Sequence, residues 1–275
     1  MAAELTAGRL VAPFYGTSTL VWALLIGAVM TSLALGQMVG GRLSRRASSL
    51  RPLGVLLGTS AALLGLLPLL ARPIMQGSLD MFRHGAFGTL LASALGVTLL
   101  LALPIVALGA TGPVLIHQAV DERDATGQVA GRLYALGSAG SLLGTYLAGL
   151  VLVPIIGTSR TLWACAAVLS VLALAGLVSR WKLAAGAAAA LAMGVAAMLV
   201  PVGPIKERRW SIFEAETPYN YLQVTDNGQE RRLYLNDGYA VQSVYPADGS
   251  LPLFSVWGYY ALSPSWTTSG PVSYT

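Results

Sequence analysis

The sequence predicts a mainly α protein, a polytopic transmembrane helical bundle followed by a small antiparallel β meander. Hydrophobic residues make up 55% of the 275 residues and charged residues only 11%, whereas soluble globular domains carry about 25% charged residues. The mean hydropathy is +0.66. Long uncharged runs are followed, after Lys206, by short alternating segments joined by turn signals. This composition excludes a disordered chain, a coiled coil and a secreted disulfide scaffold, and the single cysteine, Cys165, cannot form an internal disulfide.

Six uncharged runs are long enough to cross a bilayer, whose apolar core of about 30 Å needs about 20 helical residues. The expected spans are 17–40, 52–71, 85–120, 133–159, 161–179 and 183–205. Run 85–120 is too long for one straight helix and contains Pro104 and Pro113. Residues 1–205 are therefore expected to form a transmembrane domain of about six spans.

Small residues at four-residue spacing mark the strongest pattern inside an apolar run. In lipid, this spacing lets two helix backbones approach closely. We interpret the pattern as helix packing, with a ligand-contacting face as the alternative. It comprises Gly137, Gly140, Ser141, Gly144, Thr145 and Gly149. Gly36 and Gly40 repeat the spacing in the first span, where we also expect packing.

Residues 206–248 predict a small β domain. Three strands are expected at 219–225, 231–236 and 239–245, because Asn227-Gly228 and Asp237-Gly238 are strong turn signals. Three strands without a covering layer are marginally stable, so the meander should need a partner domain or the membrane surface. Residues 249–275 show no periodicity and are expected to form an irregular, truncated tail.

Most chemistry is excluded by the residues that the chain lacks. No Asp or Glu lies inside an apolar run, which argues against a proton-coupled carrier. His84 and His117 have no partners at zinc spacing, so we expect no metal. No basic patch is interleaved with aromatic residues, so we expect no nucleic acid as a partner.

The meander is the candidate region for binding or catalysis, because it concentrates aromatic and amide side chains. It is either an ordinary exposed sheet or one wall of a cleft for a polar or cationic substrate. The side chains concerned are Tyr219, Tyr221, Gln223, Tyr234, Asp237 and Gln242.

Four stretches of the chain carry a family resemblance. They are 9–16 with 33–36 and 40–43; 109–113; 131–145 with 154–158; and 216–224 (ETPYNYLQV) with 233–238 (LYLNDG) and 241–243 (VQS). The first three resemble the membrane segment of multi-pass membrane spermidine-synthase-like proteins, in which a major-facilitator-like segment is fused to a polyamine aminopropyltransferase. The fourth resembles the N-terminal β-domain of aminopropyltransferases. The third and fourth are the more specific.

The resemblance implies transfer of an aminopropyl group from decarboxylated S-adenosylmethionine to putrescine, with no further cofactor. In that family a Rossmann-like domain supplies the catalytic residues, and this sequence contains no such pattern. We therefore expect a chain clipped at both ends, without catalytic residues and inactive alone. The implied partners are the lipid bilayer and a missing or separate Rossmann-like domain, with a homo-oligomer left open. The implied location is the bacterial inner membrane.

The same resemblance implies substrate binding by Tyr219, Asn220, Tyr221 and Gln242. Asn220 stands where the family has glutamine, one methylene longer, whereas Gln242 matches the family pattern. Two other functions stay open: a small membrane transporter, and a membrane scaffold protein with a docking β-sheet.

Basic residues predict the orientation of the chain in the membrane. Loop 42–51 carries Arg42, Arg45, Arg46 and Arg51 and is expected in the cytoplasm. Six complete crossings would place the meander outside, away from a cytosolic nucleotide-derived substrate. We therefore expect run 85–120 to be split or re-entrant, so that loop 42–51 and the meander are both cytoplasmic.

Overall fold

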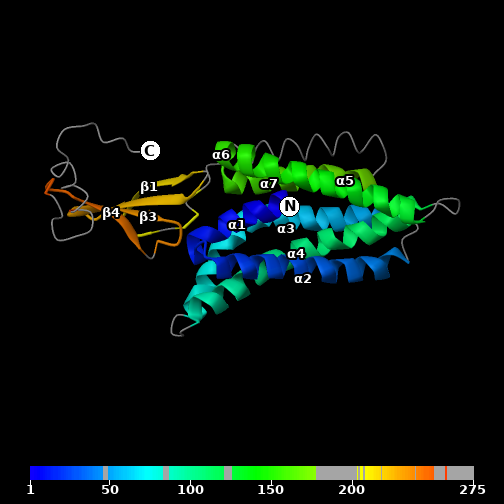
Figure 1. The fold of residues 1–275 in the computed structure, drawn as a ribbon, viewed down its shortest axis with the longest axis horizontal. Helices are drawn as coiled ribbons and strands as arrows, with labels where there is room; N and C mark the ends of the chain where they lie inside the picture. Colours follow the sequence, from blue (N-terminus) through cyan, green and yellow to red (C-terminus); the bar gives the residue numbers. More distant parts are fainter. Residues whose placement is uncertain are drawn as a thin grey trace, which may run out of the picture. The chain divides into compact units, whose positions relative to one another are not determined.

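The computed structural model describes residues 1–45, 49–82, 87–120, 126–177, 203, 205–206, 208–217, 219–238, 240–250 and 258. The chain divides into two compact units, Met1–Ile205 and Lys206–Thr275 (Figure 1). The first unit is a helical bundle and the second contains a small antiparallel sheet.

In the described part of the first unit, five helical segments are long and apolar enough to cross a membrane. The helices are α1 (Ala2–Tyr15), α2 (Thr19–Ser44), α3 (Arg51–Met81), α4 (Gly88–Ala119), α5 (Thr126–Tyr146), the π-helix η1 (Leu147–Leu152), α6 (Val153–Ile156) and α7 (Thr158–Leu177). The five spans are α2, α3, α4, the continuous α5–η1–α6 segment and α7. They confirm the first five predicted runs, and run 183–205 lies outside the described residues. The chain is an integral multi-pass membrane protein.

The prediction that run 85–120 is split or re-entrant is wrong. Helix α4 continues through both Pro104 and Pro113. Proline removes a backbone donor, but neighbouring helices can hold such a helix together in a membrane. Here α2 and α3 both pack along α4, and the Ser60 hydroxyl of α3 donates a hydrogen bond to the Pro104 carbonyl at 3.3 Å.

The continuity of α4 changes the topology prediction, because six crossing spans would place loop 42–51 and the sheet on opposite sides. Both lie on the same side only if the expected span 183–205, which falls outside the described residues, does not cross. We keep the expectation that both are cytoplasmic, and it is tested with Ser49→Cys and Ser243→Cys in a Cys165→Ala background. A membrane-impermeant maleimide should label both positions from the same side. Labelling from opposite sides would contradict the prediction.

Close backbone contact joins α2 to α4, as the spacing of Gly36 and Gly40 predicted. A Cβ on Gly40 would overlap the Ala110 carbonyl oxygen and would lie 2.8 Å from Ala110 Cα. A Cβ on Gly36 would lie 3.0 Å from Gly109 Cα. The packing prediction for Gly36 and Gly40 is confirmed.

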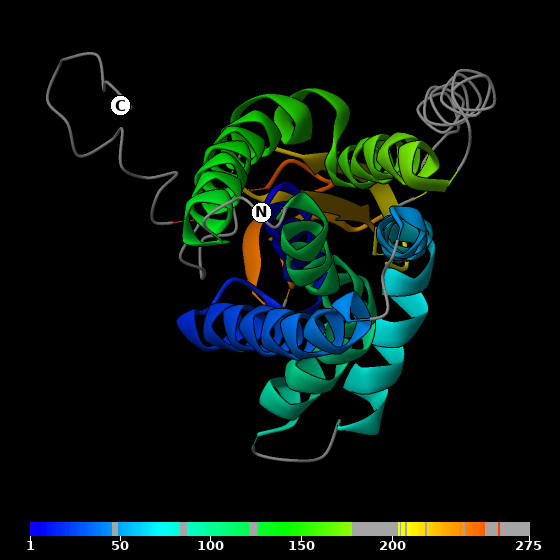
Figure 2. The same ribbon diagram turned by 90° about the vertical axis from the view of Figure 1, so that its right-hand side faces the viewer.

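A second close contact joins α3 to α7, and α1 fills the interior. A Cβ on Gly54 would lie 2.8 Å from the Ala173 carbonyl oxygen, and the Trp163 indole donates to the Gly65 carbonyl at 3.0 Å. Helix α1 is buried over most of its length inside the helical unit (Figure 2). Its Tyr15 hydroxyl lies 2.5 Å from the Ser78 hydroxyl of α3.

Within its described residues, the second unit has four strands where the sequence predicted three. They are β1 (Ser211–Glu216), β2 (Tyr221–Asp226), β3 (Glu230–Leu235) and β4 (Val241–Pro246), antiparallel and in the order β1-β2-β3-β4. Strand β1 was missed because it follows directly on the basic residues after Ile205. A bulge between Ser211 and Phe213 also interrupts its alternation.

Candidate functional site

The connections β1–β2 and β3–β4 lie at the same end of the sheet, because successive strands run in opposite directions. We call this the turn end, and its described residues are Thr217, Tyr219, Asn220, Asn236, Asp237, Gly238 and Ala240. An amide pair joins the two turns, since Asn236 Nδ2 donates to Asn220 Oδ1 at 2.9 Å. Asn236 Oδ1 also accepts from the Tyr221 amide at 3.1 Å. Asn236 has a φ of 48°, a left-handed conformation that asparagine tolerates better than most residues.

Two cations bind the turn end from the segment that precedes β1. Lys206 Nζ donates to the Asp237 carbonyl at 2.7 Å, and Arg208 Nη2 donates to the Gly238 carbonyl at 3.1 Å. The Arg208 guanidinium also lies 3.9 Å from the centroid of the Tyr234 ring, a favourable cation–π geometry.

Strand β2 buries polar side chains on one face. Tyr221, Gln223 and Thr225 alternate along the strand and are all buried, with Gln223 only 2% exposed. Gln223 Nε2 donates to the Lys206 carbonyl at 2.5 Å, and the Tyr221 hydroxyl lies 3.4 Å from the same oxygen. Burial raises the pKa of the Tyr221 hydroxyl, and a hydrogen bond with Glu214 is the second-largest cause of this rise. Because buried polar groups need partners, this face is built to hold the Lys206 backbone.

The four residues expected to bind substrate all lie at or next to the turn end. Tyr219 is 84% exposed, and Gln242 is exposed on β4, directly after the β3–β4 turn. Asn220 is engaged with Asn236, and Tyr221 is buried against Lys206. Tyr219 and Gln242 are therefore exposed, whereas Asn220 and Tyr221 are engaged within the sheet.

Sequence reasoning missed Lys206, Arg208 and Asn236 as members of this site. Lys206 and Arg208 were interpreted only as the end of the membrane part. The period-two polar pattern of Tyr221, Gln223 and Thr225 was the available signal. A strand that buries polar groups indicates that another polar segment covers it.

Lys206 should give the sheet a pH-dependent stability. Burial, reinforced by the positive charge of Arg208 and opposed by Asp237, lowers the pKa of Lys206 from 10.5 to about 8. Between these values the unfolded state binds more protons, so the free energy of unfolding should rise as the pH rises from 8. Above about pH 10 the raised pKa of Tyr221 reverses the trend, because only the unfolded tyrosine then loses its proton. Urea unfolding, followed by a probe at Ser243→Cys, measures the profile.

The control for this profile is Lys206→Met, which should flatten the rise above pH 8 while leaving the fall above pH 10. An unchanged rise in Lys206→Met would show that another group causes it.

The predicted packing face of α5 and η1 is only partly engaged by the described chain. A Cβ on Gly144 would lie 3.5 Å from the Ala2 Cβ, and one on Gly149 would lie 3.1 Å from Leu5 Cδ2. Ser141 and Thr145 are half-buried and linked, since the Thr145 hydroxyl donates to the Ser141 carbonyl at 2.9 Å. Among the described residues nothing lies within 4 Å of a Cβ placed on Gly137 or Gly140, so their packing role stays a prediction.

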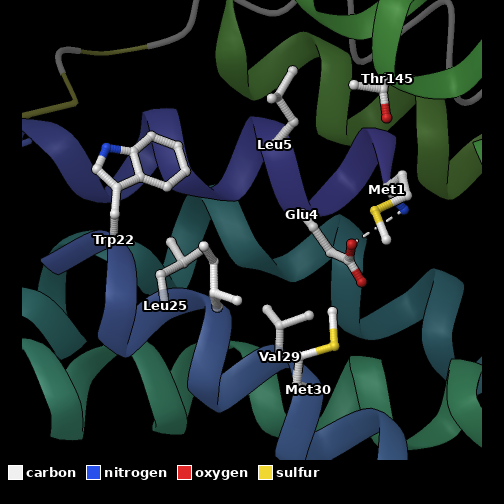
Figure 3. A pocket seen from close by; sticks show the side chains of 9 residues that line it. Met1, Glu4, Leu5, Trp22, Leu25, Val29, Met30 and Thr145 are labelled. Carbon is white, nitrogen blue, oxygen red and sulfur yellow. Dashed lines mark ion pairs between the residues drawn. The ribbon is translucent and has the colours of Figure 1, made fainter. Parts of the chain in front are cut away.

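The helical unit also contains a pocket of about 180 Å³ beside this face (Figure 3). Helix α2 contributes most of its lining, which is apolar. The lining residues are Met1, Glu4, Leu5, Trp22, Leu25, Ile26, Val29, Met30 and Thr145. The Glu4 carboxylate pairs with the Met1 ammonium at 3.3 Å. This lining suits hydrocarbon better than a polar solute, so the pocket does not favour the transporter hypothesis.

The fold and this site define a multi-pass membrane protein with a small antiparallel sheet whose polar turn end is fixed by two cations. Comparison with protein-family models, with curated proteins and with solved structures found no match. Within the described part of the chain, no group of three His, Cys, Asp or Glu residues could hold a metal ion.

Proposed function

We propose that the chain is the membrane and β-domain part of a spermidine synthase-like protein. One observation carries the proposal. The three stretches that resemble the aminopropyltransferase β-domain, 216–224, 233–238 and 241–243, lie on successive strands and meet around the turn end of one sheet. A shared location is what a common role in one cleft wall requires.

In this proposal the turn end forms one wall of a cleft for cationic substrates. Both decarboxylated S-adenosylmethionine, a sulfonium, and putrescine, a diamine, are cations. The exposed Tyr219 ring can attract a cation, and the Gln242 amide can accept a hydrogen bond from an ammonium group. Asn220, Asn236, Lys206 and Arg208 keep the wall in place.

Aminopropyl transfer itself needs groups that the sheet does not supply. The amine nitrogen attacks the carbon next to the sulfonium, the carbon–sulfur bond breaks, and sulfur keeps the electron pair as a neutral thioether. The amine must lose a proton to a positioned base, which contributes about 10²- to 10⁴-fold to the rate. We propose that a Rossmann-like domain provides this base and binds the nucleoside, and that the enzyme resides in the bacterial inner membrane.

Fusion to the nucleotide-binding domain of an aminopropyltransferase tests the proposal. The chain alone should not turn over putrescine and decarboxylated S-adenosylmethionine, whereas the fusion should form spermidine. Tyr219→Ala should raise the KM of the fusion about two- to thirtyfold, because a cation–π contact contributes about 0.5 to 2 kcal/mol. Gln242→Ala should also raise the KM.

The matched control is Gln229→Ala, which alters an exposed side chain in the β2–β3 turn at the opposite end of the sheet. It should leave the KM unchanged. Equal effects of Tyr219→Ala and Gln229→Ala would remove the site assignment, and a fusion that makes no spermidine would refute the proposed function.

A further inference from the structure

We infer that β1 and the turn before it dock on the surface of an anionic membrane, with Trp210, Ile212 and Phe213 entering the headgroup region. The observation that leads to this inference is an exposed apolar corner among the described residues of the sheet. These three side chains are 56%, 57% and 55% exposed, respectively. The inference is independent of the proposed function.

The backbone around Trp210 holds this corner in a defined shape. Trp210 has a φ of 61°, which is uncommon for a bulky residue. Two hydrogen bonds fix this turn: the Ser211 amide donates to the Arg208 carbonyl at 3.2 Å, and the Asp226 amide donates to the Trp210 carbonyl at 2.9 Å. The bulge that follows interrupts the alternation of Ile212 and Phe213. The exposed side chains are thus presented by a fixed turn and the edge strand of the sheet.

The chemistry of the corner fits a bilayer surface. Tryptophan is enriched where membrane meets water, because its ring is apolar and its N–H is polar. The Arg209 guanidinium lies 4.5 Å from the centroid of the Trp210 ring, so a cation accompanies the aromatic ring. Anionic headgroups attract such basic residues, whereas the apolar side chains favour the acyl boundary.

The chain also keeps this corner near a membrane. The last apolar run of the sequence, 183–205, ends immediately before Lys206, and Trp210 follows four residues later. Five residues reach at most about 17 Å when fully extended. Trp210 is therefore held within that distance of the end of the run.

Lipid quenching of a fluorescent probe tests the inference in the full-length chain. The probe is attached at Ile212→Cys or, as the matched control, at Ser243→Cys on the opposite edge strand, both in a Cys165→Ala background. The protein is reconstituted in phosphatidylcholine vesicles with phosphatidylglycerol and headgroup spin-labelled lipid. Quenching should be several-fold stronger at position 212 than at position 243.

A charge variant separates docking on anionic lipid from mere proximity. Arg209→Gln should reduce the affinity of the corner for the membrane, followed by lipid quenching at position 212, about fivefold when phosphatidylglycerol is present. In phosphatidylcholine alone, the variant should have little effect on quenching. Equal quenching at positions 212 and 243 would overturn the inference. So would a probe at position 212 that is shielded from aqueous iodide yet not quenched by lipid, because a polypeptide, either a partner or a second copy, would then cover the corner.

Discussion

Replacing Gly40 with valine should destabilise the helical unit by about 3 kcal/mol. The new side chain would have to occupy the space of the Ala110 backbone, which cannot rotate away as a side chain can. Overpacking commonly costs about 1 to 3 kcal/mol, and a backbone obstacle places this site at the upper end of that range. Unfolding by SDS titration of the detergent-solubilised protein measures the loss.

Gly41→Val is the matched control for this experiment. Gly41 is the next residue of α2, and among the described residues nothing lies within 4 Å of a Cβ placed on it. The two variants share the same change in helix propensity, so their difference isolates the contact with α4. If both unfold at the same SDS mole fraction, the α2–α4 contact does not limit stability.

Replacing Gln223 with methionine should release the segment that holds the turn end. Methionine keeps the length of the side chain but cannot donate to the Lys206 carbonyl, so a buried hydrogen bond is lost. Losing one hydrogen bond costs about 0.5 to 1.5 kcal/mol, because the Tyr221 hydroxyl still reaches the same carbonyl. Amide hydrogen exchange at Ser211, which donates to the Arg208 carbonyl, should accelerate about two- to twelvefold.

Two further variants define this result. Gln229→Met, at an exposed position, should leave exchange at Ser211 unchanged. Tyr221→Phe combined with Gln223→Met should cost more than the sum of the single changes, because both side chains reach the same carbonyl. If the two losses of free energy simply add, Tyr221 and Gln223 do not act together on the Lys206 carbonyl.

The helical fold was predictable because hydrophobic run length directly reports a transmembrane helix. Spans α2, α3 and α7 were expected from charge-free runs, and the Gly36–Gly40 spacing also predicted close packing. The error at Pro104 and Pro113 has a tertiary cause. Proline was judged by its effect on an isolated helix, whereas α2 and α3 support α4 along its length.

The candidate site was predictable only in part, because its residues come from segments of different character. Tyr219, Asn220, Tyr221 and Gln242 were found through turn signals and a family resemblance. Sequence position could not show that Tyr221 is buried or that Asn220 is engaged by Asn236. Lys206 follows an apolar run, so its charge was assigned to topology, although its Nζ binds a turn 31 residues away.

The π-helix η1 changes how the small-residue pattern of its span must be counted. The pattern was counted with the four-residue repeat of an α-helix, which pairs Thr145 with Gly149. The two glycines of this span that approach α1 are Gly144 and Gly149, five apart, in keeping with the i→i+5 hydrogen bonds of a π-helix. Leu147–Leu152 thus contains one residue more than a regular helix would need there. A homologue with an uninterrupted α-helix should align to this span with a single-residue gap between Tyr146 and Val153.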